Sequence, residues 1–174
     1  MNNALCPILG FSAPSGTGKT TLLSQLIPLL KKNNVRVGLI KHSHHNFQID
    51  KPGKDSFRLR EAGATPVMLV SSHRRAIITE FAEPTEPNLN EQLAYFDQTE
   101  LDLILVEGFK AESFPKIELH RSSLSQALRY PDDDAIIAVA SDEPLALSRN
   151  IPLLDLNNIS QITDFILHTI LKHD

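Results

Sequence analysis

The sequence has little of several residues that define whole classes of protein. Its 174 residues include one cysteine, no tryptophan and two tyrosines, and 17 Lys and Arg stand against 21 Asp and Glu. Cys6 has no partner in the chain, so a disulfide framework is excluded and the reducing cytoplasm is the expected location. A mildly acidic chain with few aromatics also lacks the basic stripe and stacking rings of a nucleic-acid-binding protein.

Long hydrophobic runs are missing as well. No segment reaches the ~18 consecutive apolar residues that a membrane-spanning helix needs, and the first residues lack the pattern of a signal peptide. We therefore expect a protein without membrane contact. A chain of this length can bury a core of its own, so residues 1–174 are predicted to form a single domain.

Short apolar runs alternate with amphipathic or turn-rich stretches along the chain. Several of these runs are apolar at nearly every position, which is typical of strands covered on both faces, as in parallel sheets. The alternation predicts an α/β layered fold with a mostly parallel central sheet flanked by helices. The expected strands are 7–13, 35–41, 66–71, 76–79, 101–106, 116–119, 135–140 and 152–156.

Three amphipathic stretches predict helices. The first helix covers 19–33 and is expected to bend at Pro28, because proline removes a backbone hydrogen bond to the preceding turn. Asp55 or Ser56 is expected to cap a short second helix, and Ser160 to cap the last one.

The remaining polar stretches have simpler interpretations. Residues 83–90 and 122–134 are predicted to be surface loops without chemistry. His73, Arg74 and Arg75 form a basic turn between two expected strands. In a kinase such arginines could close over phosphates, but a hairpin this short is more simply a solvated turn.

The strongest functional signal is a glycine-rich loop between the first strand and the first helix. It reads Ala13-Pro14-Ser15-Gly16-Thr17-Gly18-Lys19-Thr20 and matches the phosphate-binding P-loop apart from Ala13, where glycine usually stands. In such loops backbone N–H groups surround a phosphate at the positive end of a helix. The expected phosphate contacts are Ser15, Gly16, Thr17, Gly18, Lys19, Thr20 and Thr21, and residues 1–174 would be one P-loop nucleotide-binding domain.

A carboxylate at the end of another strand completes this pattern. The run 101–106 leads directly into Glu107, which corresponds to the Walker B acid that holds Mg²⁺ directly or through water. We predict Thr20 and Glu107 as the residues that hold Mg²⁺. The simpler alternative is that Glu107 is a solvated charge. Asp102 lies at the start of the same strand and is expected to be a turn or cap residue.

A second carboxylate, Asp142, follows the strand 135–140 and is our candidate for reading the nucleotide base. In familiar GTPases an Asp at the corresponding strand end accepts hydrogen bonds from guanine. The competing interpretation is a plain turn, because Asp142 is followed by Glu143 and Pro144. The residues after the next strand, Asp155, Asn157 and Asn158, could line the same pocket.

Three histidines, His42, His44 and His45, follow the second strand. Imidazole binds Zn²⁺, Ni²⁺ and Cu²⁺, but adjacent side chains on an extended strand point to opposite sides, so at most two could easily share one ion. A metal site, a loop that contacts an anion or cofactor, and structural histidines all remain open. Within 50–56, Asp50, Lys54 and Asp55 could form a switch that senses Mg²⁺ and the γ-phosphate, although Asp55 could simply be a cap.

Together these segments resemble the molybdopterin-guanine dinucleotide biosynthesis protein B family, MobB. The residues that carry the resemblance are 14–21, 38–45, 50–56, 101–110 and 138–142. The resemblance implies a dimeric GTP-binding adaptor with weak GTPase activity in molybdenum cofactor biosynthesis. It would assist the guanylyltransferase that joins molybdopterin to GMP, with molybdopterin as a further ligand. On this chain, Gly16, Gly18, Lys19 and Thr20 would hold GTP and Mg²⁺, with Glu107 as the acid.

Two other functions fit parts of the sequence. A small-molecule kinase would need a catalytic Asp and a basic lid, for which Asp50, Asp55 and the Arg74-Arg75 turn are available. A nucleotide-dependent metallochaperone would use His42, His44 and His45. In the leading interpretation hydrolysis is slow, because no recognisable motif supplies an arginine finger or a water-positioning Gln.

Overall fold

The computed structural model describes residues 1–43 and 46–173, and the chain divides into two compact units. Unit 1 consists of Met1–His42 and the chain from Asn88 onward, and unit 2 consists of Ser43–Pro87. In the part of the chain that is described, no helix is long and apolar enough to cross a bilayer. That 1–174 acts as a single domain stays a prediction.

Unit 1 is built on a six-stranded sheet in the order β2-β5-β1-β6-β7-β8, in which every neighbouring pair of strands is parallel. The predicted α/β fold is therefore confirmed. The strands are β1 Ile8–Ser12, β2 Val37–Lys41, β5 Leu103–Glu107, β6 Lys116–His120, β7 Ile136–Ser141 and β8 Leu153–Asp155. Unit 2 contains α2 Asp55–Glu61 and an antiparallel hairpin of β3 Val67–Val70 and β4 Arg75–Ile78.

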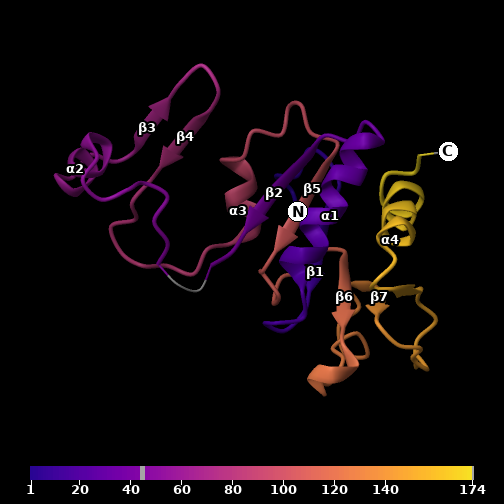
Figure 1. The fold of residues 1–174 in the computed structure, drawn as a ribbon. Helices are drawn as coiled ribbons and strands as arrows, with labels where there is room; N and C mark the ends of the chain where they lie inside the picture. Colours follow the sequence, from indigo (N-terminus) through magenta and orange to yellow (C-terminus); the bar gives the residue numbers. More distant parts are fainter. Residues whose placement is uncertain (44–45, 174) are drawn as a thin grey trace. The chain divides into compact units, whose positions relative to one another are not determined.

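Alternating side chains place two apolar clusters on the two faces of the sheet. Leu9 and Leu105 belong to a cluster with α1 Lys19–Lys32, α4 Ile159–Phe165 and the π-helix Ile166–Ile170. Ile8 and Ile104 belong to a second cluster with α3 Leu89–Ala94. Because both faces of β1 and β5 are covered, these strands are apolar at nearly every position. Figure 1 shows α1 and α4 beside the strands of unit 1.

On one face of the sheet at β6 and β7, loops rather than a helix cover the strands. Buried Glu118 accepts hydrogen bonds from the backbone N–H groups of Arg129 and Tyr130, each 2.8 Å long, and burial raises the pKa of this carboxyl. Tyr130 packs against Ile136 and Val139. The stretch 122–134, predicted to be a plain surface loop, thus contributes to the core, and its only regular element is the 3₁₀ turn Ser122–Leu124.

Two of the predicted helix caps are wrong. The last helix begins at Ile159, so Asn158 and not Ser160 caps it, and the Asn158 Oδ1 accepts from the Gln161 N–H at 3.1 Å. Lys54 precedes α2 and makes no side-chain cap; Ser56 instead donates its hydroxyl to Asp50.

The predicted extent of the first helix is confirmed, but a shorter helix escaped prediction. Helix α1 continues through Pro28 to Lys32. The expected polar connector 83–90 ends in α3, whose first turn is capped by Asn88 through a bond from the Glu91 N–H.

Candidate functional site

The P-loop lies at the edge of the sheet to which the parallel strands of unit 1 run (Figure 1). It connects the end of β1 at Ser12 to the start of α1 at Lys19. Gly16 and Gly18 have φ values of +84° and +99°, which glycine adopts without the steric cost of a Cβ. Ala13, which replaces the usual first glycine, is buried directly after β1. The sequence motif therefore has the strand, loop and helix context that phosphate binding requires.

Lys19, the lysine of the P-loop motif, lies across the loop itself. Its ammonium donates to the carbonyl oxygens of Ala13 at 2.9 Å and Pro14 at 2.8 Å, and the Thr17 hydroxyl donates to the same Pro14 oxygen. Burial lowers the pKa of Lys19, and the positive charge of Lys110 lowers it further. A phosphate oxygen would replace carbonyl oxygens as the acceptor and would relieve this charge crowding.

Glu107 stands where a Walker B acid is expected. It ends β5, which pairs with β1 on one side and β2 on the other, and its Cα partners are Phe11 and Lys41. The Glu107 Oε2 lies 3.1 Å from the Lys41 ammonium, and the Glu107 side chain is only 14% exposed. Glu107 thus ends its strand as predicted, and the structure adds that this strand neighbours the P-loop strand. The simpler alternative of a solvated charge does not describe a carboxylate this buried, and the Mg²⁺ role stays a prediction.

The loop after Glu107 packs against His42. A Cβ on Gly108 would lie 2.6 Å from the His42 Cβ, and Phe109, with a φ of +50°, stacks on the imidazole at a centroid distance of 4.7 Å. His42 thus has a structural contact. His44 and His45 lie outside the described residues, and within 1–43 and 46–173 no group of three or more His, Cys, Asp or Glu could hold a metal ion.

Asp142 follows β7 and is held by the chain after β6. Its Oδ1 accepts from the Ser122 N–H at 3.0 Å, a bond that lowers the pKa of this carboxyl, and its Oδ2 lies 3.5 Å from the Arg121 Nη1. Both contacts are compatible with a turn role, and base reading by Asp142 stays a prediction. Asp155 accepts from the Asn157 N–H and Asn158 caps α4, so these residues order the start of that helix.

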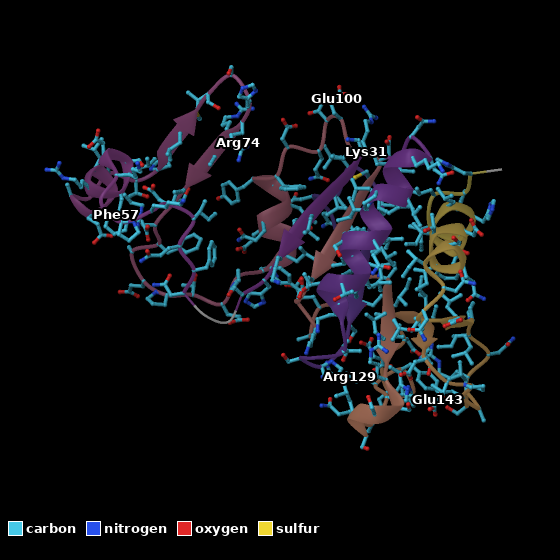
Figure 2. The ribbon with its side chains drawn as sticks, viewed as in Figure 1. Lys31, Phe57, Arg74, Glu100, Arg129 and Glu143 are labelled. Atoms are coloured by element: carbon cyan, nitrogen blue, oxygen red, sulfur yellow. The ribbon has the colours of Figure 1, made fainter. Side chains whose placement is uncertain are left out.

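The remaining predicted residues belong to unit 2. Asp50 accepts a hydrogen bond from the Ser56 hydroxyl at 2.9 Å, and Lys54 and Asp55 lie at the start of α2. Arg74 lies in the turn of the β3–β4 hairpin and is labelled in Figure 2. Their proposed switch and lid roles stay predictions.

Sequence reasoning missed one residue of the site, Arg121. Its Nε donates to the Thr17 carbonyl oxygen of the P-loop at 2.9 Å. Arg121 follows β6 directly, and β6 pairs with β1, so the residue emerges beside the loop. Knowing that β6 neighbours β1 would have found it, but strand order is not visible in the sequence.

The parallel sheet, the P-loop after its central strand and the acid at the end of the adjacent strand define the fold of the P-loop NTPases. Solved structures agree. A structure titled molybdopterin-guanine biosynthesis protein B superposes with a TM-score of 0.72 at 23% identity, covering 94% of this chain and 99% of that one. Bacillus subtilis MobB superposes with a TM-score of 0.74 at 21% identity, covering 94% and 98%.

Sequence comparison identifies the family. The family model of Molybdopterin guanine dinucleotide synthesis protein B, MobB, matches residues 8–142. The molybdopterin-guanine dinucleotide biosynthesis adapter protein of Haemophilus influenzae is 50% identical over 167 residues, covering 95% of this chain and 90% of that protein. The Escherichia coli protein of the same name is 45% identical, covering 98% and 97%. The chain belongs to the MobB family.

Proposed function

We propose that this chain is an accessory protein, an adapter, of molybdopterin guanine dinucleotide biosynthesis, and that it binds GTP with Mg²⁺ at the P-loop. The role rests on the family and on the names of the Haemophilus influenzae and Escherichia coli relatives. The observation that carries nucleotide binding is the position of Glu107 at the end of β5, directly beside the strand that leads into the P-loop.

Different residues of the site would bind the phosphates of GTP and the Mg²⁺ ion. The backbone N–H groups of 15–21 and the Lys19 ammonium would bind the phosphates. The Thr20 hydroxyl and Glu107 would hold Mg²⁺, which neutralises phosphate charge when it is bound. The Lys41 ammonium, now 3.1 Å from Glu107, would have to share that carboxylate with the ion. We expect weak GTP hydrolysis at most.

The partners follow from the adapter role. We propose that the chain acts in the cytoplasm on the guanylyltransferase that joins molybdopterin to GMP, with molybdopterin itself as a further ligand. These proposals rest on family membership.

We also propose a homodimer, and unit 2 supplies the physical support. Met68, Val70 and Ile77 are 56%, 75% and 57% exposed, and Met68 pairs with Ile77 across the hairpin. A two-stranded hairpin is marginally stable alone, so a permanent cover for this face is expected. A second copy of the chain could cover this apolar face, and it is always present at the same concentration as the first.

Nucleotide binding is tested by titrating GTP and ATP with Mg²⁺ into the protein, Lys19→Ala and the control Lys32→Ala, which removes an exposed lysine from the same helix. We expect GTP to bind more tightly than ATP, binding to be lost in Lys19→Ala and to be kept in Lys32→Ala. Tighter ATP binding, with phosphate released only when a small acceptor is added, would support the kinase instead. Absence of binding to the unmodified protein would contradict nucleotide binding.

The dimer is tested by sedimentation at tens of micromolar. Ile77→Lys places a charge on the apolar face and should shift the protein toward the monomer, whereas Ser72→Lys, in the exposed turn of the same hairpin, should not. A monomeric unmodified protein would contradict the dimer.

A further inference from the structure

Arg121 is a charged side chain that contacts the P-loop and has no role in the P-loop pattern. In a strand, alternate residues share a face, so Arg121 continues the row of Ile117 and Leu119, which pack in the cluster that contains α1. Its guanidinium therefore reaches the start of that helix. The Nε donates to the Thr17 carbonyl oxygen at 2.9 Å, and Nη2 lies 3.7 Å from the point where a Cβ on Gly18 would be.

The bonded carbonyl belongs to the same peptide unit as the Gly18 N–H. A trans peptide is planar, and its C=O and N–H point in opposite directions. When Arg121 holds the Thr17 oxygen on one side, the Gly18 N–H must point to the other. Gly18 has a φ of +99°, so a residue with a side chain would resist this orientation of the peptide.

Charge explains why this arrangement points to an anion. The N-terminus of a helix carries positive potential, so a cation beside it is unfavourable unless negative charge is supplied. Asp142 supplies part of it, 3.5 Å from the Arg121 Nη1, while its other oxygen is held by the Ser122 N–H. Lys19 adds a second cation to the same loop. A bound anion would neutralise the positive charge that Asp142 leaves unbalanced.

We propose that Arg121, held in place by Asp142, is a positioning residue that aims the Gly18 N–H at the nucleotide phosphates; this inference rests on the proposed binding of a nucleotide at the P-loop. Asp142 then acts on the phosphates through Arg121 and does not read the base. The two roles of Asp142 differ in what they predict. A base reader changes the preference for GTP over ATP, whereas a residue that acts through Arg121 changes the affinity for both nucleotides equally.

The test uses inorganic tripolyphosphate, GTP and ATP, each with Mg²⁺, on the full chain by calorimetry. The variants are Arg121→Ala, Arg121→Lys, Asp142→Asn and Lys19→Ala, with Arg129→Ala as the control that removes an exposed arginine from the adjoining loop. We expect Arg121→Ala to weaken tripolyphosphate, GTP and ATP alike by about tenfold, the order of one charged hydrogen bond. Arg121→Lys should recover part of the affinity, because it keeps the charge and loses the planar donor fork.

A spectroscopic readout separates positioning from mere support of the fold. The Gly18 amide resonance should shift when tripolyphosphate is added to the unmodified protein. That shift should be reduced in Arg121→Lys, which keeps the charge and serves if Arg121→Ala does not fold. A residue that only supports the fold would lower the melting temperature and leave the Gly18 shift intact, which would overturn the inference.

The other outcomes separate this inference from the proposed function. If the unmodified protein binds tripolyphosphate, Lys19→Ala does not and Arg121→Ala binds normally, the inference fails and nucleotide binding stands. If the unmodified protein binds none of the three probes, the proposed nucleotide binding itself fails and this inference falls with it. If Asp142→Asn loses GTP while keeping ATP and tripolyphosphate, Asp142 reads the base and the inference is overturned.

Discussion

Unit 1 and unit 2 of the same chain differ in how their side chains are packed. In unit 1 the core side chains of the sheet, such as Leu9, Leu105 and Ile117, have no exposed surface or almost none. In unit 2 every residue that the structure describes is half-buried or exposed. The packing of unit 1 can therefore specify its own fold, whereas the described residues of unit 2 form no buried core of their own.

The elements of unit 2 support this interpretation. Helix α2 has seven residues and each strand of the hairpin has four, lengths that are marginal in water without packing. Large apolar side chains are nevertheless exposed there; besides those of the hairpin they are Phe47, Ile49, Leu59 and Phe81. A monomeric protein rarely exposes so many large apolar residues within one short segment.

The largest expected difference concerns local opening. In the Ile77→Lys variant, which removes the proposed dimer contact, backbone amides of β3 and β4 should open at a free energy below about 2 kcal/mol. Backbone amides of β1 and β5 should open only at a free energy close to that of global unfolding, on the order of 5–15 kcal/mol. Native-state hydrogen exchange measures both. Equal protection of the hairpin and the central strands would show that unit 2 is stable alone.

The next largest expected difference between the units is the loss of stability when a leucine is truncated to alanine. Leu26→Ala removes a side chain with no exposed surface from α1 and should lower the free energy of unfolding by about 2–5 kcal/mol. Leu59→Ala removes a side chain that is 62% exposed in α2 and should change it by less than about 0.5 kcal/mol. Urea unfolding of the two variants gives the comparison. If Leu59→Ala lowered the free energy of unfolding as much as Leu26→Ala, Leu59 would have to be buried in the folded protein in solution.

Two glycines offer a finer test. A Cβ on Gly10 in β1 would lie 2.6 Å from the Phe114 ring, so Gly10→Ala should cost about 1–3 kcal/mol of global stability through overpacking. Gly63→Ala meets no atom within 4 Å, but its φ of +103° makes alanine strained. That strain should weaken unit 2 and leave the global unfolding midpoint unchanged. Equal shifts of the global unfolding midpoint in the two variants would contradict the expected difference between the units.

The smallest effect concerns an ion pair at the edge of the unit 1 sheet where β2 and β5 begin, opposite the edge that carries the P-loop. The Arg36 side chain bonds both oxygens of Asp102 and lowers the pKa of that carboxyl to about 2. A lowered folded-state pKa stabilises the protein above the unfolded pKa of about 4, and this contribution is lost as the pH falls through about 2.

Solvent screening keeps this contribution below about 1 kcal/mol. Asp102→Asn should therefore be slightly less stable than the unmodified protein at pH 7, and the difference should shrink between pH 4 and pH 2. Asp164→Asn, which removes an exposed carboxylate in α4, is the control. A difference between Asp102→Asn and the unmodified protein that grows on acidification would refute the assignment.

The sequence predicted the sheet and the P-loop because both depend on local patterns. Strands buried on both faces are apolar throughout, and Gly16, Gly18 and Lys19 serve a backbone geometry that other residues do not provide. The placement of Glu107 followed from its strand. These features required no knowledge of which strands are neighbours.

Features that depend on packing were not predictable in this way. Asn158 and Ser160 are both good capping residues, and the choice between them follows from which turn brings Ile162 into the core. Helix α3 presents only Leu89 and Leu93 to the sheet, too few apolar positions to establish a helical period. Arg121 could be recognised only from the pairing of β6 with β1.

The position of β1 at the centre of the sheet has a consequence for the protein as it emerges from the ribosome. Phe11 is made before all of unit 2, yet its strand partners Glu107 and Ile117 are made after all of unit 2. At roughly 5–20 residues per second, the P-loop strand waits several seconds for its neighbours. We therefore expect the nascent chain to order its P-loop only after β5 and β6 have been made, with apolar β1 left for chaperones to shield until then.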